Sequence, residues 1–341
     1  MSRSFEVELI NGKHGDPAVH VTIQQTGQHI LVDMGDIQNL SKRLLHRTDY
    51  LLVSHAHMDH FAGFDTFLRS HIPHRRLVQV LGPENIAKQI CRKIKAYTWN
   101  LIDEDQLTYK VFEIRGNRIF RSASFSRGSN FEFTYQDESI QTLNLERDLS
   151  LNFVALDHQG IDSIAYKINL PERIKVDVEK MTELNLKPGP WISTLQAMSA
   201  SERGEAMLVI DEISYSGKDL VDRLFQSYNE SMVYITDAGF STENICRLKQ
   251  SLGSCSYFLC ESSFRHIDRD RAVAKSHLTT RQAALLAVLL NCHEFEVFHF
   301  SNIYKGSLDL SDEALKYWDN LKAVDSSSFV KLVEEEATIN T

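Results

Sequence analysis

The sequence has few of the residues that break, cross-link or anchor a chain. It contains only 6 prolines and 15 glycines among 341 residues, and 43% of its residues are hydrophobic, which excludes a largely disordered protein. The 5 cysteines are odd in number and scattered without a C-x-x-C pair, which argues against a disulfide framework and a thiolate zinc site. No apolar run approaches the roughly 20 residues that span a bilayer, and the first twenty residues carry charges where a signal peptide is apolar. A globular cytoplasmic protein without a membrane segment is expected.

Positive charge is also in short supply. The formal net charge is −9, from 37 basic and 46 acidic side chains, which argues against a protein that coats nucleic acid. Residues 71–100 nevertheless concentrate Arg75, Arg76, Lys93 and Lys95 near aromatic side chains. This segment is either a local basic patch or the solvated face of an amphipathic helix, and the second interpretation is favoured.

No linker, low-complexity tract or repeat divides the chain, so a single domain is predicted over residues 1–325. Strands are expected at 5–10, 20–23, 30–32, 50–53 and 77–81, and helices at 60–71 and 84–98. Residues 106–156 are strand-like, and strands then alternate with helices, including one at 218–227. This order suggests two sheets packed face to face with helices outside. Residues 326–341, ending in "VEEEATINT", are expected to form an acidic tail that frays.

The densest polar cluster stands in the stretch "LLVSHAHMDHFAG". An apolar segment typical of a buried strand ends there, and His55, His57, Asp59 and His60 follow at once. Residues two apart on an extended backbone point the same way, so His55 and His57 can converge on one ion, with Asp59 and His60 facing a second. Such ligands suit Zn²⁺, with Mn²⁺ or Fe²⁺ as alternatives. Gly63 lacks the side chain that would keep the next helix away from this loop. The alternative without a metal site, surface histidines in a loop, is disfavoured by the H-x-H-x-D-H pattern.

Further candidate ligands each follow a predicted strand. "VALDHQG" contains His158, "YITDAGF" contains Asp237 and "VFHFSNIY" contains His299. Taken singly, His158 is more typical of a structural histidine and Asp237 of a turn former. His299 is the weakest of the three candidates. Their order after the first cluster favours a shared site that holds two metals.

This order of residues resembles the metallo-β-lactamase superfamily. The resemblance spans residues 30–304 and implies an α/β fold, a four-layer αββα sandwich with a two-metal site along one edge of its sheets. Five segments resemble the ribonuclease Z family in its order, namely "LDHQGIDSIAYKI", "LKPGPWISTL", "CESSF", "KSHLTTRQAA" and "HFSNIY". The resemblance implies two cations, the first held by His55, His57 and His158, the second by Asp59, His60 and His299, with Asp237 between them.

A second pair of residues is suited to proton transfer. His277 precedes a predicted helix whose start is marked by a capping box, Thr279 with Gln282. Glu261 ends the preceding strand and can tune that histidine, and the resemblance to ribonuclease Z assigns both residues to a proton relay. The alternatives are an ordinary helix-entry histidine and a surface acid. Asp33 in "LVDMGD" is a candidate to hold a ligand histidine by a hydrogen bond, or else a turn residue.

The chain departs from the ribonuclease Z pattern in several places. "INGKHGDPAVH" and "DMGDIQNL" replace the family's glycine-rich loop and its Gly-Glu-Gly-Thr run, and Cys260 stands where the family usually has histidine. The family's substrate arm is expected between Tyr166 and Pro188, where the sequence has mixed charge and predicts a strand end and a short helix. No substrate-binding exosite is evident there.

The leading prediction is a metal-dependent phosphodiesterase of the ribonuclease Z type, which uses a metal-activated water, with Asp59 orienting it, to cleave at the 3′ side of precursor tRNA. Net acidity and the altered loops keep a smaller substrate open, such as a cyclic nucleotide or short RNA. Thioester or lactone hydrolysis on the same fold is disfavoured by His277 and Glu261. A binding protein without activity is disfavoured by the complete set of candidate ligands. The family resemblance implies a homodimer.

Overall fold

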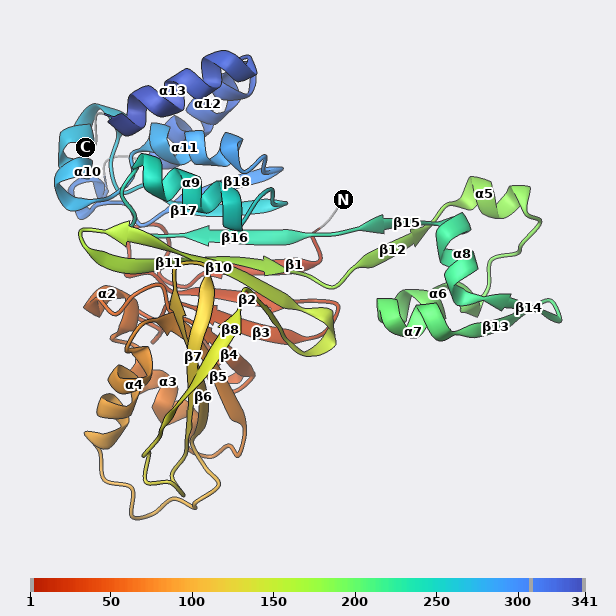
Figure 1. Ribbon diagram of the computed structural model, residues 1–341, viewed down its shortest axis with the longest axis horizontal. Coiled ribbons are helices and arrows are strands. Elements are labelled where there is room, and N and C mark those ends of the chain that lie inside the picture. The colour runs from red at the N-terminus through yellow and green to blue at the C-terminus, as the bar shows by residue number, and fades with distance from the viewer. Residues whose placement is uncertain (1–2, 307–308, 339–341) are drawn as a thin grey trace. The chain divides into compact units, whose positions relative to one another are not determined.

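The computed structural model describes residues 3–306 and 309–338, which form two compact units (Figure 1). Of the described residues, one unit comprises 3–143, 152–167, 232–306 and 309–338, and the other comprises Asn144–Leu151 and Ile168–Ser231. The candidate metal ligands all belong to the first unit. Among the described residues, no helix is both long and apolar enough to cross a membrane.

The N-terminal half of the first unit is an eight-stranded sheet whose strands follow chain order. Strands β1 to β3 pair antiparallel, β3 to β6 pair parallel, and β6 to β8 pair antiparallel. The predicted hairpin-rich start and the five predicted strands are therefore present. The strands are β1 (Phe5–Leu9), β2 (Val19–Ile23), β3 (Gln28–Val32), β4 (Thr48–Leu52), β5 (Leu77–Pro83), β6 (Thr108–Arg115), β7 (Arg118–Phe125) and β8 (Tyr135–Ile140).

A six-stranded sheet in the order β18-β17-β16-β11-β10-β9 forms the other half. Its strands are β9 (Thr142–Asn144), β10 (Ser150–His158), β11 (Ile161–Asn169), β16 (Ser231–Ile235), β17 (Tyr257–Glu261) and β18 (Glu294–Phe298). Because β16, β17 and β18 are parallel, their carboxyl ends lie at one edge of the sheet. The residues that follow these strands, among them Asp237 and His299, are thereby brought together although the chain separates them.

Helices cover the outer face of each sheet. Short helices α1 (Lys42–Leu45) and α2 (Met58–Phe61) precede α3 (Phe64–His71) and α4 (Ile86–Lys95), whose apolar side chains share a buried core with the first sheet. The predicted helix 60–71 is thus divided into α2 and α3. On the second sheet lie α9 (Thr242–Ser251), α10 (Arg269–Lys275), α11 (Thr280–Leu289) and α12 (Leu310–Lys322).

The inner faces of the two sheets are in contact. The Tyr166 hydroxyl on β11 donates hydrogen bonds to the backbone oxygens of Val53 and Leu81, at 2.7 and 3.1 Å, and these residues belong to the first sheet and its β4 loop. The layers therefore run helix, sheet, sheet, helix. The predicted αββα sandwich is confirmed.

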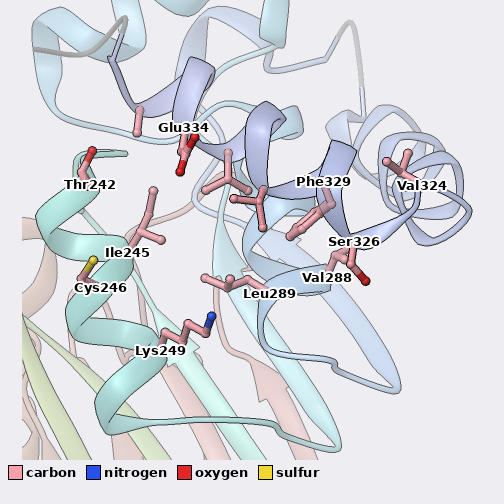
Figure 2. Close-up of a pocket in the computed structure, with 13 residues that line it drawn as sticks. Thr242, Ile245, Cys246, Lys249, Val288, Leu289, Val324, Ser326, Phe329 and Glu334 are labelled. Carbon is pink, nitrogen blue, oxygen red and sulfur yellow. The ribbon is translucent and has the colours of Figure 1, made fainter.

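The C-terminal segment is ordered, and the expectation that it frays is wrong for residues 326–338. These residues form helix α13 (Ser326–Thr338), whose Phe329, Leu332, Val333 and Ala337 pack against the core of α9 and α11. Figure 2 shows Phe329 pointing into a groove that α13 shares with those helices. The acidic composition concealed an apolar stripe at helical spacing. Residues 339–341 of the predicted tail lie outside the described part of the chain.

The second unit has a core of its own. Strand β12 (Arg173–Val176) pairs antiparallel with β15 (Phe225–Tyr228), and β13 (Met207–Ile210) forms a hairpin with β14 (Ile213–Ser216). The predicted helix 218–227 is α8 (Gly217–Leu224), which ends where β15 begins. The remaining helices are α5 (Val178–Glu183), α6 (Pro190–Ala197) and α7 (Ala200–Glu205). The residues buried together are Ile174, Met181, Trp191, Leu195, Ile210, Leu220, Leu224 and Phe225.

Candidate metal centre

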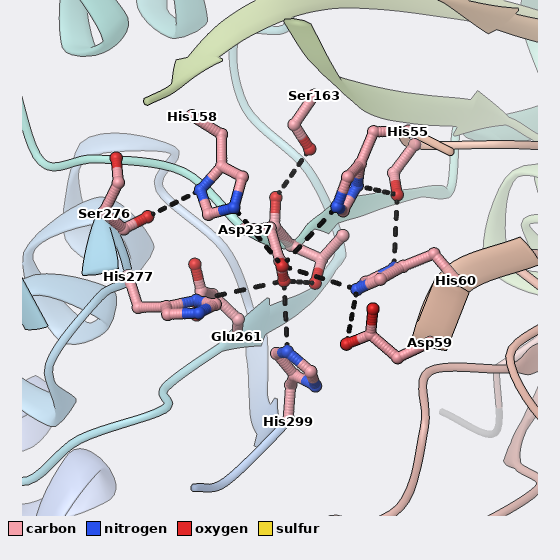
Figure 3. Close-up of polar contacts among 12 residues, drawn as sticks. His55, Asp59, His60, His158, Ser163, Asp237, Glu261, Ser276, His277 and His299 are labelled. Atoms are coloured by element: carbon pink, nitrogen blue, oxygen red, sulfur yellow. Dashed lines mark hydrogen bonds and ion pairs between the residues drawn. The ribbon is translucent and has the colours of Figure 1, made fainter. Parts of the chain in front are cut away.

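The seven predicted ligands lie together at the carboxyl edges of the two sheets. Figure 3 shows six of them, all except His57. Strand β4 ends just before the loop that carries His55 and His57, and β10 ends in His158. Three groups have ligand atoms that all lie within 4.8 Å of one another. The first group is His55, His57, His158 and Asp237, the second is Asp59, His60 and His299, and the third is Asp237, His277 and His299. The first two groups contain the two sets that the resemblance implied.

Asp237 lies between the first two groups. Its Oδ2 atom is 3.6 Å from Nε2 of His55, 3.4 Å from Nε2 of His60 and 3.7 Å from Nε2 of His158. Its Oδ1 atom is 3.2 Å from Nε2 of His299. One buried carboxylate therefore faces imidazole nitrogens of both groups, which is the placement expected of a bridging ligand.

The histidines present unused nitrogens toward this centre. Nδ1 of His55 contacts Ser54 Oγ at 3.0 Å, Nδ1 of His60 contacts Asp33 at 2.9 Å, and Nδ1 of His158 contacts the backbone oxygen of Ser276 at 2.9 Å. A proton on Nδ1 leaves a lone pair on Nε2. Among residues 3–306 and 309–338, the buried Nε2 atoms of His55 and His60 have no hydrogen-bond partner. Buried imidazole lone pairs around a carboxylate fit divalent metal ions.

Asp33 organises the inner side of the centre. It is fully buried and accepts hydrogen bonds from the Ser54 backbone N–H (2.7 Å), the Ser54 hydroxyl (2.7 Å), His60 Nδ1 (2.9 Å) and the Tyr234 hydroxyl (2.8 Å). The hydrogen bond to a candidate ligand histidine is thus present, as expected. The sequence did not indicate Ser54 or Tyr234, because nothing in their local pattern separates them from ordinary strand residues.

The electrostatics of the centre follow from burial and from these contacts. Burial, reinforced by the neighbouring His60, lowers the pKa of His55 to about 2, so this ring is neutral as a metal ligand must be. Burial also opposes charge on His60, but the carboxylates of Asp237 and Asp33 outweigh it and raise its pKa. For Asp237, burial opposes the charged form, yet His299 and His60 hold its pKa well below the usual range.

His277 and Glu261 form a pair beside the metal ligands. Nδ1 of His277 lies 2.9 Å from Oε2 of Glu261, which is fully buried at the end of β17. Glu261 also accepts hydrogen bonds from the backbone N–H of Ala238 (2.9 Å) and the hydroxyl of Ser263 (2.8 Å). Burial disfavours the charged ring, but Glu261 prevails and raises the pKa of His277 to about 9. The pair can therefore carry a proton next to the centre.

Two glycines allow the backbone around the centre to pack closely. A Cβ on Gly63 would lie 2.7 Å from the Met34 backbone oxygen, so the close approach at this glycine is to the loop after β3 and not, as predicted, to the metal-binding loop. A Cβ on Gly35 would lie 1.8 Å from the backbone oxygen of Asp59. The loop after β3 and the metal-binding loop can touch only because these side chains are missing.

The loop that replaces the family's glycine-rich segment lies beside the centre. The backbone N–H of Phe300 donates to the Lys13 carbonyl at 2.8 Å, which fixes the loop beside His299. Asp16 in the same loop has a raised pKa because of partial burial and the nearby carboxylate of Asp59. An additional acidic side chain therefore lies close enough to the second group of ligands to interact with it electrostatically. No sequence pattern indicated this residue.

The basic segment at residues 71–100 is largely neutralised. Arg75 pairs with Asp103 and Asp105, Arg76 with Asp49, Lys93 with Asp65 and Lys95 with Glu132. Helix α4 turns its isoleucines into the core, so the favoured interpretation of a solvated helix face agrees with the structure.

Known proteins share this architecture. No family model matches the sequence. A metallo-β-lactamase fold protein of Bacillus subtilis, YhfI, superposes with a TM-score of 0.52 at 13% identity, over 93% of this chain and 92% of its own. The chain has the metallo-β-lactamase fold. The short form of human tRNase Z shares this metallo-β-lactamase fold, with a TM-score of 0.50 at 13% identity, over 88% of this chain and 93% of its own.

A curated relative is similar in sequence as well. Ribonuclease Z of Deinococcus radiodurans is 28% identical over 302 residues, which cover 85% of this chain and 88% of that protein. The resemblance to ribonuclease Z, which short segments of this metallo-β-lactamase-fold protein indicated, is confirmed over most of the chain.

Proposed function

We propose that the protein is a metal-dependent phosphodiesterase of the ribonuclease Z type, which cleaves precursor tRNA on the 3′ side. The observation that carries this proposal is the His277–Glu261 pair beside two groups of metal ligands, in a chain 28% identical to a ribonuclease Z. Hydrolysis of a phosphodiester requires an activated water and a proton for the leaving oxygen. The centre offers residues for both tasks.

Two Zn²⁺ ions are the proposed cofactors, with Mn²⁺ or Fe²⁺ as alternatives. His55, His57 and His158 would hold one ion, Asp59, His60 and His299 the other, and Asp237 both. The chemistry that such ions supply is Lewis acidity, which acidifies water and neutralises phosphate charge. Asp33, by accepting from Nδ1 of His60, orients that ring and leaves Nε2 facing the centre.

The protein's own side chains orient and protonate the reactants. The Asp59 side chain is 43% exposed, so it can accept a hydrogen bond from the attacking water as well as ligate. Glu261 accepts a hydrogen bond from the Nδ1–H of His277. The other ring nitrogen, Nε2, is therefore the atom that donates a proton to the leaving oxygen. Glu261 is itself held by Ala238 and Ser263, so the ring cannot turn freely.

The direct test is cleavage of a precursor tRNA transcript by metal-loaded protein, with the cut end mapped by sequencing. Cleavage at the 3′ side is expected from the native chain. Asp59→Ala should abolish it, whereas Asp65→Ala should not, because Asp65 lies on α3 and pairs with Lys93 at the surface. Equal cleavage by native protein and Asp59→Ala would refute the assignment.

A smaller phosphodiester is the second candidate substrate, and one observation favours it. Four of the six basic side chains of residues 71–100 are paired with carboxylates, and Asp16 adds a carboxyl group near Asp59. Long RNA gains less from such a surface than a small ester does. Efficient hydrolysis of bis-p-nitrophenyl phosphate together with no cleavage of precursor tRNA would favour this candidate.

A homodimer is proposed on the similarity to ribonuclease Z alone. Sedimentation velocity at micromolar concentration should give about twice the mass of 39.1 kDa. A single species at the monomer mass would refute it.

A further inference from the structure

The position of His277 depends on the start of helix α11. The backbone N–H of His277 donates to the Ala272 oxygen at 2.9 Å, and the oxygen of the next residue, Leu278, accepts from the N–H of Phe264 at 3.3 Å. Thr279 then caps α11. His277 therefore stands on a short connection whose far end is fixed by the helix cap.

This cap is a reciprocal one. The Gln282 backbone N–H donates to Thr279 Oγ1 at 3.3 Å, and the Thr279 backbone N–H donates to Gln282 Oε1 at 3.0 Å. Both side chains are buried, with exposed fractions of 0% and 1%. The second hydrogen bond requires the oxygen of the Gln282 amide, and not its nitrogen, to face Thr279.

A residue of the C-terminal helix determines that orientation. Nε2 of Gln282 donates to Oε1 of Glu336 at 3.0 Å, and Glu336 on α13 is only 2% exposed. Nη1 of Arg281 lies 3.5 Å from the other carboxylate oxygen, so both oxygens of Glu336 face donors. A carboxylate can only accept hydrogen bonds, so the Gln282 amide must turn its nitrogen toward Glu336 and its oxygen toward Thr279.

We propose that Glu336 is a positioning residue for the proton donor His277. It acts through Gln282 and Thr279, and α13 brings it there by packing Phe329, Leu332 and Val333 against the core. This inference rests on the proposed function, in which His277 protonates the leaving oxygen. Without Glu336, the Gln282 amide has no reason to prefer one orientation, the Thr279 N–H loses its acceptor in part of the molecules, and His277 is less well placed.

The test compares two substrates that differ in their need for a proton. The p-nitrophenolate leaving group of bis-p-nitrophenyl phosphate departs without being protonated. The ribose alkoxide of an RNA dinucleotide must be protonated as it departs. General acids contribute about 10²- to 10⁴-fold, so partial misplacement in Glu336→Ala should lower kcat on the dinucleotide by about tenfold or more. The kcat on the nitrophenyl ester should change less than about twofold, and KM should stay constant for both.

The ratio of the two kcat values is the decisive readout, because it does not depend on how much of the sample is folded. Glu336→Gln preserves the volume but can present either a donor or an acceptor to Gln282, so an intermediate ratio is expected. Glu335→Ala is the matched control, since this neighbouring glutamate is exposed. It should leave the ratio unchanged. An unchanged ratio in Glu336→Ala would overturn the inference.

Hydrogen exchange provides a second readout that needs no metal or substrate. The Thr279 amide proton should exchange faster in Glu336→Ala than in the native chain, and Glu335→Ala should match the native rate. Equal protection of Thr279 in Glu336→Ala would contradict the proposed route.

His277→Ala separates failure of the inference from failure of the proposed function. If His277→Ala changes the ratio and Glu336→Ala does not, only the role of Glu336 is refuted. If His277→Ala leaves the ratio unchanged, the proposed proton donor is wrong. In the double variant, Glu336→Ala should add no further change in the ratio, because its effect passes through His277.

Discussion

Replacing Asp33 by asparagine tests how the buried network sets the protonation of a metal ligand. Asp33 accepts hydrogen bonds from four donors at 2.7 to 2.9 Å, and asparagine offers one oxygen and a donating amide in its place. The hydroxyls of Ser54 and Tyr234 can rotate their hydrogens and accept. His60 cannot do so without moving its proton from Nδ1 to Nε2, which would remove the lone pair that faces the metal position.

The expected losses follow from this asymmetry. Asp33→Asn removes the buried carboxylate that accepts these hydrogen bonds. This loss should lower the free energy of unfolding of the metal-free protein by roughly 3 kcal/mol. The changed tautomer of His60 should weaken binding of one of the two metal ions by about 10- to 100-fold. The other ion, held by His55, His57 and His158, should bind almost as before.

Two titrations measure these quantities. Competition with a fluorescent chelator gives both metal affinities, and urea unfolding of metal-free protein gives stability. Tyr234→Phe is the matched control, because it removes one donor to Asp33 at 2.8 Å and keeps the His60 contact. It should cost about 1–2 kcal/mol and leave metal affinity unchanged. Native affinity for both ions in Asp33→Asn, or an equal loss in Tyr234→Phe, would refute the reasoning.

Three further predictions concern the frame around the centre. Gly35→Ala should destabilise the protein by on the order of 3 kcal/mol and reduce metal content, because its Cβ would lie 1.8 Å from the Asp59 oxygen; normal metal content by elemental analysis would contradict this. Tyr166→Phe should cost about 1–3 kcal/mol by urea unfolding, since its hydroxyl bonds to Val53 and Leu81, and should leave activity intact. Removal of metal by a chelator should abolish hydrolysis and lower the melting temperature, and Zn²⁺ should restore both; persistent activity in metal-free protein would exclude metal-dependent catalysis.

The ligand groups could be predicted because their signals are local and ordered. His55, His57, Asp59 and His60 form one short motif, and His158, Asp237 and His299 each follow a recognisable strand. Parallel strands bring their carboxyl ends to one edge, so sequence order translates into spatial proximity. The sandwich itself could be predicted from the order of strands and helices and from the resemblance to the metallo-β-lactamase superfamily.

Other features could not be predicted, because they depend on contacts between distant residues. Tyr234 reaches Asp33 only once the two sheets have packed, whereas Ser54 reaches it from the end of the neighbouring strand β4. The Ser276 contact with His158 is made by a backbone oxygen that carries no sequence signal. The second compact unit has no compositional boundary, since its ends continue strands β10, β11 and β16. Helix α13 combines an acidic composition with apolar residues at helical spacing, and only the packing against α9 and α11 shows that the apolar residues decide its structure.

The wide separation of the ligands along the chain has a consequence for the resistance of the protein to unfolding and proteolysis. The ligand atoms around Asp237 come from residues between positions 55 and 299, which belong to both sheets. Bound ions would therefore cross-link the two sheets. Binding free energy of this kind adds directly to the cost of opening the sandwich, and its loss exposes the chain to proteases. A cell that runs short of transition metal would then lose the protein itself, and not only its turnover.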